Sequence, residues 1–256
     1  MSQPQNESPV AAQEPLHRSR WRRFSPSMGW RAFWSEILIV VIGVVIALAA
    51  NEAVEKWNWR NKVADGEARL REDTANVFEW SAERYATGPC IDAQLEALIA
   101  RVKDSGERLD PAPIHTSLNM RRVLTAPQRP FRFPVWDALV ADGTASRMSP
   151  QRQALYGRLG QSLERMRLRN EDYMRLRGRM LVLAHPIELD AQTRNRLLTD
   201  LEELRAMNAV DVRALGQDMN FITEYGIAPG SKSVEEFLAT STTIRFCREQ
   251  GLPMSD

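Results

Sequence analysis

Apolar and polar residues are mixed along most of the chain, but residues 37–50 form an uninterrupted apolar run. A helix rises about 1.5 Å per residue, so the segment from Trp34 to Trp57 spans about 34 Å, close to the bilayer's hydrocarbon core of about 30 Å. Tryptophans gather at both membrane interfaces. The pattern predicts a transmembrane helix with aromatic flanks at 30–59 and a core at 37–50. The competing interpretation is a cleaved signal peptide, which Ala47-Leu48-Ala49 fits.

Beyond the apolar run, a helical rhythm of apolar positions continues and predicts a stalk that ends at Gly88-Pro89. A second helix is predicted from about Ile91, with Gly106 as its stop signal. Residues 107–134 are rich in proline, which is excluded from regular helix interiors, so they predict an irregular loop where partners could bind.

The remaining pattern predicts helices. A short helix is expected at 135–140, closed by Gly143, and Ser149-Pro150 marks the start of a long one. Its stripe has the four-three spacing of coiled coils and contains Leu159, Leu163, Met166, Asn170, Tyr173 and Arg177. After the break at His185-Pro186, a partner helix is expected from about Asp190. The two predict a long antiparallel hairpin over 150–222.

The predicted fold is therefore all-α: a transmembrane helix that continues into a stalk, followed by a helical bundle at 60–256. One short β-branched stretch, 240–244, is ambiguous between strand and helix. The first 29 residues combine prolines with polar residues and basic side chains, which predicts a disordered tail.

Basic residues near the apolar run indicate its orientation. Five arginines precede it and four basic residues follow it in a similar window, and the tight cluster at 20–23 favours a cytoplasmic N-terminus. We therefore expect residues 60–256 on the periplasmic side of a bacterial inner membrane. The residues compared are Arg18, Arg20, Arg22, Arg23 and Arg31 before the run, and Lys56, Arg60, Lys62 and Arg69 after it.

The chain has two cysteines, Cys90 and Cys247, and both follow the apolar run. In an oxidising compartment they could form a disulfide, whereas two separate thiols are the alternative, because spacing alone does not establish proximity. The sequence leaves both interpretations open.

Two asparagines, Asn170 and Asn208, interrupt the apolar stripes of the predicted hairpin. A buried amide without a partner costs about 1–3 kcal/mol, so each is expected to have a specific role. One role is to fix the register of the paired helices, and the alternative is to line a ligand cavity between them.

One face of the predicted transmembrane helix carries Glu36, Gly43, Ala47 and Asn51. Small residues four apart let two membrane helices approach closely, and polar residues can hydrogen-bond across the contact. This pattern predicts self-association of the chain through the membrane helix.

Candidate catalytic chemistry is sparse. The three histidines, His17, His115 and His185, have no metal-ligand spacing, and nucleophile-elbow, phosphate-loop and dinucleotide-binding motifs are missing from the sequence. The arginines of helix 150–183 scatter around its axis, which favours a solvated helix over a nucleic-acid-binding face. The expectation is a non-enzymatic protein without cofactor, metal or nucleic-acid partner.

The segment Ser35–Leu48, together with Asn51 and Trp57, resembles a family of uncharacterised bacterial single-pass membrane proteins with the anchor pattern E-I-L-L-x-V-I-G-x-x-I-A-L-x-x-N-x-W. Residues 136–143 resemble a later turn of that family. The resemblance implies an inner-membrane anchor and a helical outer domain, and it implies no activity or catalytic residues.

Together these features predict a bilayer-anchored envelope protein that contacts or scaffolds other envelope proteins. The alternative is a ligand sensor whose periplasmic bundle signals through the membrane helix to a partner.

Overall fold

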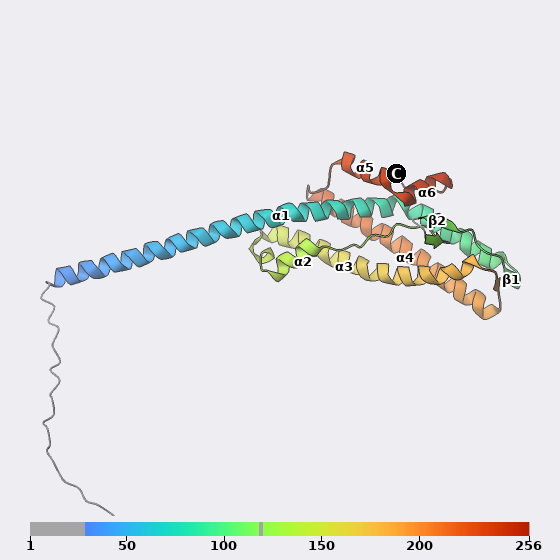
Figure 1. Cartoon of the computed structure of the whole chain (residues 1–256), viewed down its shortest axis with the longest axis horizontal. Coiled ribbons are helices and arrows are strands. Elements are labelled where there is room, and N and C mark those ends of the chain that lie inside the picture. The colour runs from blue at the N-terminus through green and yellow to red at the C-terminus, as the bar shows by residue number, and fades with distance from the viewer. Residues whose placement is uncertain (1–28, 118–119, 256) are drawn as a thin grey trace, which may run out of the picture. The chain divides into compact units, whose positions relative to one another are not determined.

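The computed structural model describes residues 29–117 and 120–255, and over them the protein is almost entirely helical (Figure 1). This confirms the all-α expectation. The α-helices of the described part are α1 (Trp30–Asp104), α2 (Pro134–Ala141), α3 (Pro150–Arg179), α4 (Ala191–Glu224), α5 (Ser231–Thr240) and α6 (Thr242–Glu249). Short 3-10 helices occupy Ala145–Arg147 and Met180–Ala184.

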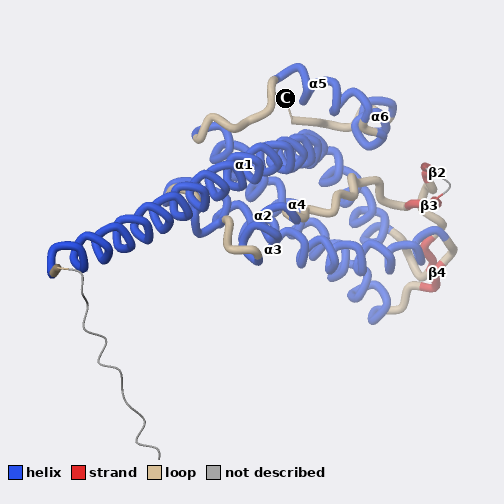
Figure 2. Tube along the Cα trace, turned by 60° about the vertical axis from the view of Figure 1, so that its left-hand side comes forward, coloured by secondary structure: helices blue, strands red, loops and turns tan. Residues whose placement is uncertain are grey.

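Strands are limited to two small antiparallel pairs in the described residues. In the first, β1 (Arg108–Leu109) pairs with β4 (Ile187–Glu188). In the second, β2 (His115–Ser117) pairs with β3 (Met120–Arg122). Figure 2 shows these strands in red among the helices. The ambiguous stretch at 240–244 belongs to no strand, because Ser241 caps the start of α6 and accepts a hydrogen bond from the Ile244 amide.

The chain divides into two compact units, Met1–Glu55 and Lys56–Asp256. In the first unit, the described residues form the first part of α1, which contains an apolar stretch long enough to cross a membrane. The predicted disordered tail at 1–29 lies, apart from residue 29, outside the described residues. The second unit contains the rest of α1 and all other helices.

The expected helix end at Gly88-Pro89 is wrong, because α1 passes through Pro89 and ends at Asp104. Proline inside a helix costs about 3 kcal/mol or more, since it lacks an amide hydrogen and crowds the preceding turn. Two outside donors bind carbonyls here: the Asn208 side chain donates to Gly88 O at 3.0 Å, and the Ser255 amide donates to Ala86 O at 3.0 Å. Both acceptors lie in the turn before Pro89, so contacts with distant segments hold this part of α1.

The long hairpin is confirmed. Ser149 caps α3 by accepting a hydrogen bond from the Arg152 amide, and Pro150 occupies its first turn. Asp190 caps α4 through the Thr193 amide at 2.6 Å. The short helix is also confirmed: α2 is followed by Gly143, whose φ of +78° is accessible to glycine at little cost.

Two apolar clusters form the core of the second unit. One contains Leu70 and Val77 of α1, the buried apolar residues between Leu155 and Met166 of α3, and those between Leu215 and Ile222 of α4. The other contains Ile91 to Val102 of α1, Tyr173 to Met180 of the α3 region, and Leu197 to Leu204 of α4. Residues of the expected stalk thus belong to the core. Along α1 and α3 the first cluster precedes the second, whereas along α4 the second precedes the first. This order fits three packed helices of which α4 runs opposite to the other two, as Figures 1 and 2 show.

Apart from the short strands β1, β2 and β3, the proline-rich segment 107–134 is irregular as expected, but it is not simply an exposed loop. Val123, Leu124 and Ala126 are buried in one apolar cluster, and Phe131 and Phe133 in the other. The segment therefore packs along the bundle and bridges both halves of its core.

Candidate functional site

The residues predicted for self-association all lie on the first part of α1. Glu36, Gly43, Ala47 and Asn51 are exposed, and a Cβ atom added at Gly43 would meet no other atom within 4 Å. Close approach of a second helix at Gly43 is therefore sterically open, while self-association itself stays a prediction.

The structure brings the two cysteines together. Cys90 follows Pro89 in α1, Cys247 lies in α6, and their sulfur atoms form a disulfide with a Cα–Cα distance of 6.0 Å. Both residues are fully buried. The bond fastens the C-terminal helices to α1, and the Ser255 amide reaches α1 independently at Ala86 O.

The two asparagines have partners outside the hairpin. Asn170 Nδ2 donates to the carbonyl oxygen of Arg129 at 3.3 Å, which joins α3 to the proline-rich segment. Asn208 Nδ2 binds Gly88 O, which joins α4 to α1, while its buried Oδ1 has no hydrogen-bond partner among the described residues. Neither bond crosses between α3 and α4, so a role in the register of that pair stays a prediction.

Asn170 and Asn208 belong to a layer of polar residues between the two apolar clusters. On each of the three long helices, this layer occupies the positions between the cluster residues. We call it the polar layer, and its members are Glu83, Arg84 and Thr87 of α1, Arg169 and Asn170 of α3, and Asn208 and Asp211 of α4.

Asp211 is the charged centre of the polar layer. Only 6 % exposed, it forms ion pairs with Arg169 at 2.8 Å and with the buried Arg84 at 3.8 Å. The Arg84 guanidinium also lies 5.1 Å from the ring centre of Tyr173. A single carboxylate therefore forms ion pairs with two arginines. Arg84 Nη1 is buried without a hydrogen-bond partner in the described part of the chain.

A second carboxylate of the layer, Glu83, is 2 % exposed. It accepts a hydrogen bond from Arg129 Nε at 2.7 Å and another from the Ser241 hydroxyl. Because Arg129 lies in the proline-rich segment and Ser241 caps α6, Glu83 ties both to α1. Burying a carboxylate without partners would cost several kcal/mol. The contacts of Glu83 therefore hold the proline-rich segment and the start of α6 against α1.

Beyond the polar layer, towards the end of α3, lies another buried arginine, Arg177. With Arg84 and Arg122 it forms a cationic region. Arg177 is 8 % exposed, and its Nη1 is buried without a hydrogen-bond partner among the described residues. Burial lowers the pKa of Arg177, and the neighbouring cations Arg122 and Arg84 lower it further, whereas Tyr173 raises it. The sequence held a signal for this: Arg177 continues the four-three stripe of Leu159, yet the scatter of the other arginines favoured a solvated helix.

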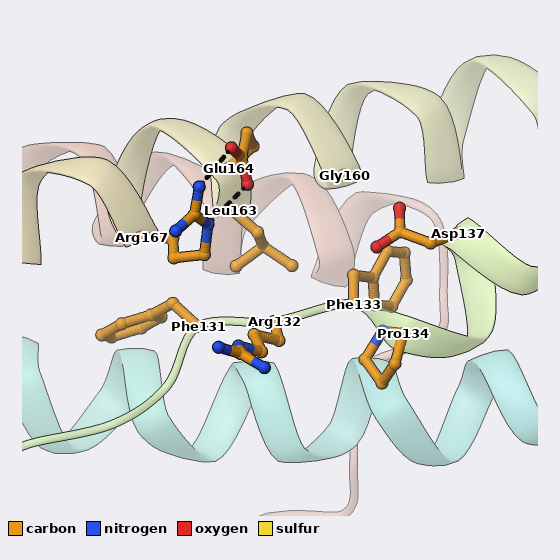
Figure 3. Close-up of a pocket in the computed structure, with 9 residues that line it drawn as sticks. All are labelled: Phe131, Arg132, Phe133, Pro134, Asp137, Gly160, Leu163, Glu164 and Arg167. Atoms are coloured by element: carbon orange, nitrogen blue, oxygen red, sulfur yellow. Dashed lines mark hydrogen bonds and ion pairs between the residues drawn. The ribbon is translucent and has the colours of Figure 1, made fainter.

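A hollow beside α3, shown in Figure 3, has a volume of about 450 Å³. Arg167 of α3 is bound there by Glu164, with 2.7 Å between Nη2 and Oε1, and also pairs with Glu171. Arg132 lies across from this pair, and Asp137 of α2 lies at the other end of the hollow (Figure 3). Acidic and basic side chains are balanced in this hollow, so it offers no net charge to a ligand.

Phe131 lines the same hollow and has a φ of +45°, unusual for a bulky residue. Its buried ring contacts Trp80 edge-on, with 6.2 Å between ring centres.

The described residues contain no group of three or more histidine, cysteine, aspartate or glutamate side chains that could hold a metal ion. His115 packs edge-on against Phe246, with ring centres 4.6 Å apart, and His185 follows the 3-10 helix Met180–Ala184. The third histidine, His17, lies outside the described residues.

Comparisons of the chain with protein-family models, with curated proteins and with solved structures find no match. The family resemblance of the apolar segment therefore stays a prediction.

Proposed function

We propose that the protein is a single-pass protein of a bacterial inner membrane, with a cytoplasmic N-terminus and a periplasmic helical domain that contacts other envelope proteins. The observation that carries this proposal is the exposure of the apolar segment: 0 % of its most apolar 18-residue window is buried. At about 25 cal/mol per Å² of apolar surface, leaving such a helix in water is strongly unfavourable, and a bilayer supplies the missing environment.

The aromatic residues at the start of α1 support an interfacial position. Trp30, Phe33 and Trp34 contact one another, with ring centres 5.7 to 6.3 Å apart, and are largely exposed. Trp57, beyond the apolar run, is also exposed. Amphipathic rings at both ends of an apolar helix are typical of membrane-spanning segments.

The disulfide supports a periplasmic domain. Buried disulfides persist in oxidising compartments such as the periplasm and are rare in the cytoplasm. Cys90 and Cys247 both follow the apolar segment, so their pairing agrees with the orientation indicated by the arginines before it.

A topology experiment tests the proposal. Alkaline phosphatase, which is active in the periplasm, and green fluorescent protein, which is fluorescent in the cytoplasm, are fused in turn after residue 256. We expect phosphatase activity without fluorescence, and the full-length chain in the membrane pellet after extraction at high pH. Fluorescence at this position would contradict the orientation. An intact mass that begins after Ala49 or Ala50 would show a cleaved signal peptide and contradict the anchor.

For the proposed scaffolding role, in-cell crosslinking of the full chain is informative. We expect specific envelope proteins to crosslink to the domain, and a variant with a neutral anchor exchange, such as Val41→Leu, to retain them. Recovery of none beyond the background of an unrelated single-pass protein would contradict the role.

A second candidate function, ligand sensing through the membrane helix, is favoured by one observation. The cationic region around Arg177 contains a buried guanidinium nitrogen without a hydrogen-bond partner among the described residues, next to a surface hollow.

A further inference from the structure

A hollow of about 140 Å³ lies between the end of β3 with its following segment and the last turns of α3. Arg121 and Arg122 line it from the strand side, and Arg177 lines it from α3. Gln128 adds an amide, and no acidic residue is among the lining residues. Three guanidinium groups around one hollow give it a positive potential.

Among the described residues, the charge of Arg177 is poorly compensated. Its Nη1 has no hydrogen-bond partner in the described part of the molecule, and no carboxylate is among the groups that shift its pKa. The buried carboxylate of the polar layer, Asp211, is already paired with Arg84 and Arg169. An uncompensated buried charge is expensive, which makes this position receptive to an anion from solution.

The shape and lining of the hollow restrict the anion. Liquid water occupies about 30 Å³ per molecule, so the hollow has room for roughly four or five waters, or for a carboxylate or phosphate with a small organic group. Its other wall is apolar and includes Val123, Met174 and Leu181. Guanidinium groups bind carboxylate and phosphate oxygens through paired, charge-assisted hydrogen bonds.

We propose that this hollow binds a small organic anion, whose carboxylate or phosphate group pairs with Arg177 and Arg122 while its apolar part lies against Val123 and Leu181. All of these residues lie in the second unit. The site is therefore independent of membrane anchoring, and its test can fail without affecting the proposed topology.

The test uses the full-length protein in detergent, with thermal unfolding and isothermal titration calorimetry as measurements. The probes are inorganic phosphate and hexanoate, with sodium chloride at the same ionic strength as the reference. We expect at least one probe to raise the unfolding midpoint, whereas chloride does not. A response to phosphate alone indicates a phosphate ligand, and a response to hexanoate alone indicates a carboxylate with an apolar body.

Two variants separate binding from a purely structural role. Arg177→Met removes the buried charge, and we expect at least tenfold weaker anion binding. The matched control is Arg175→Met on the same helix, because Arg175 is exposed and pairs with Asp172 at 2.8 Å. We expect the control to bind anions like the unaltered protein.

If Arg177→Met fails to fold, Leu181→Glu provides the second test. Leu181 is 48 % exposed at the edge of the hollow, so a carboxylate there is tolerated and can supply the counter-ion from within the chain. We expect this variant to be insensitive to both probes. An unaltered protein that neither probe stabilises above chloride, or a response that persists in Arg177→Met and Leu181→Glu, overturns the proposal and leaves Arg177 with only a favourable interaction with the α3 dipole.

Discussion

Asn208 of α4 donates a side-chain hydrogen bond to the carbonyl oxygen of Gly88, 3.0 Å away and one residue before Pro89 in α1. Pro89 cannot donate to the preceding turn, so this is where the backbone ladder of α1 is interrupted. Asn208 is buried, and the bond places a polar contact between α4 and α1 at the interruption. The contact therefore joins α4 to α1 in the turn before Pro89.

The first prediction concerns this bond. Asn208→Ala removes the donor to Gly88 O, and we expect the free energy of unfolding to fall by about 1–2 kcal/mol. Urea denaturation followed by circular dichroism measures it. Asn220→Ala, at an exposed position of the same helix, is the control and should stay within about 0.5 kcal/mol of the unaltered protein. Equal effects of the two substitutions would show that the Gly88 contact contributes nothing.

The second prediction concerns the close approach of α4 to Gly88. A Cβ atom at this position would lie 2.5 Å from Val212 Cγ2. We therefore expect Gly88→Ala to destabilise the protein by about 1–3 kcal/mol, although alanine favours helices over glycine by about 1 kcal/mol.

Gly178→Ala in α3 is the matched control, because a Cβ there meets no atom within 4 Å, and we expect it to stabilise by about 0.5–1 kcal/mol. Val212→Ala should restore part of the loss in the Gly88→Ala protein. If Gly88→Ala were as stabilising as Gly178→Ala, the packing of Val212 on α1 would have to be looser than described.

The third prediction concerns the link between Cys90 and Cys247. Their sequence separation is 157 residues. In the chain-entropy model, closing a loop of this length stabilises the native state by up to about 5 kcal/mol. We expect dithiothreitol to lower the thermal midpoint of the unaltered protein. The double variant Cys90→Ala/Cys247→Ala should start lower and be insensitive to the reductant, and a dithiothreitol effect of equal size in this variant would refute the assignment.

The fourth prediction concerns buried Asp218, which accepts a hydrogen bond from Ser162 at 2.6 Å. Burial raises its pKa above the ordinary value of 3.8, in spite of that bond. The folded protein then binds the proton more tightly than the unfolded chain, so the contribution of Asp218 to stability falls as pH rises from about 3.8 through the folded-state pKa. We expect Asp218→Asn to raise the thermal midpoint at neutral pH, with a gain that shrinks towards acidic pH.

Asp142 provides a control of opposite sign. Hydrogen bonding by Thr144, assisted by Lys62, lowers the pKa of this exposed carboxyl to about 2. Its ionised form therefore stabilises the folded state above the unfolded-state pKa, and this contribution is lost as pH falls through about 2. We expect Asp142→Asn to lower the midpoint at neutral pH and to approach the unaltered protein in acid. Parallel pH profiles for the two variants would contradict at least one of the two assignments.

Local sequence signals located most helices well. Ser149-Pro150 and Asp190 mark the starts of α3 and α4, since capping depends on residues next to each other in the chain. The end predicted at Gly88-Pro89 failed for the converse reason. Asn208 and Ser255, which bind the carbonyls of that turn, are more than 100 positions away along the chain.

The candidate sites also separate into those that local sequence reveals and those that depend on distant contacts. The apolar segment could be identified from composition, because the hydropathy of fourteen consecutive apolar residues does not depend on the rest of the fold. The charged polar layer could not be identified. Arg84 and Asp211 each resemble a surface residue in their own helix, and only packing places them together between two apolar clusters.

By itself, the sequence determined the helical class, the apolar segment and the starts of the hairpin helices, because these depend on local hydrogen bonding and hydrophobic periodicity. Only the tertiary structure decided that α1 continues through Pro89, that Cys90 meets Cys247, and that Arg177 is buried beside other arginines. These features require contacts between distant segments, and such contacts are set by the joint packing of all the helices rather than by any one stretch of residues.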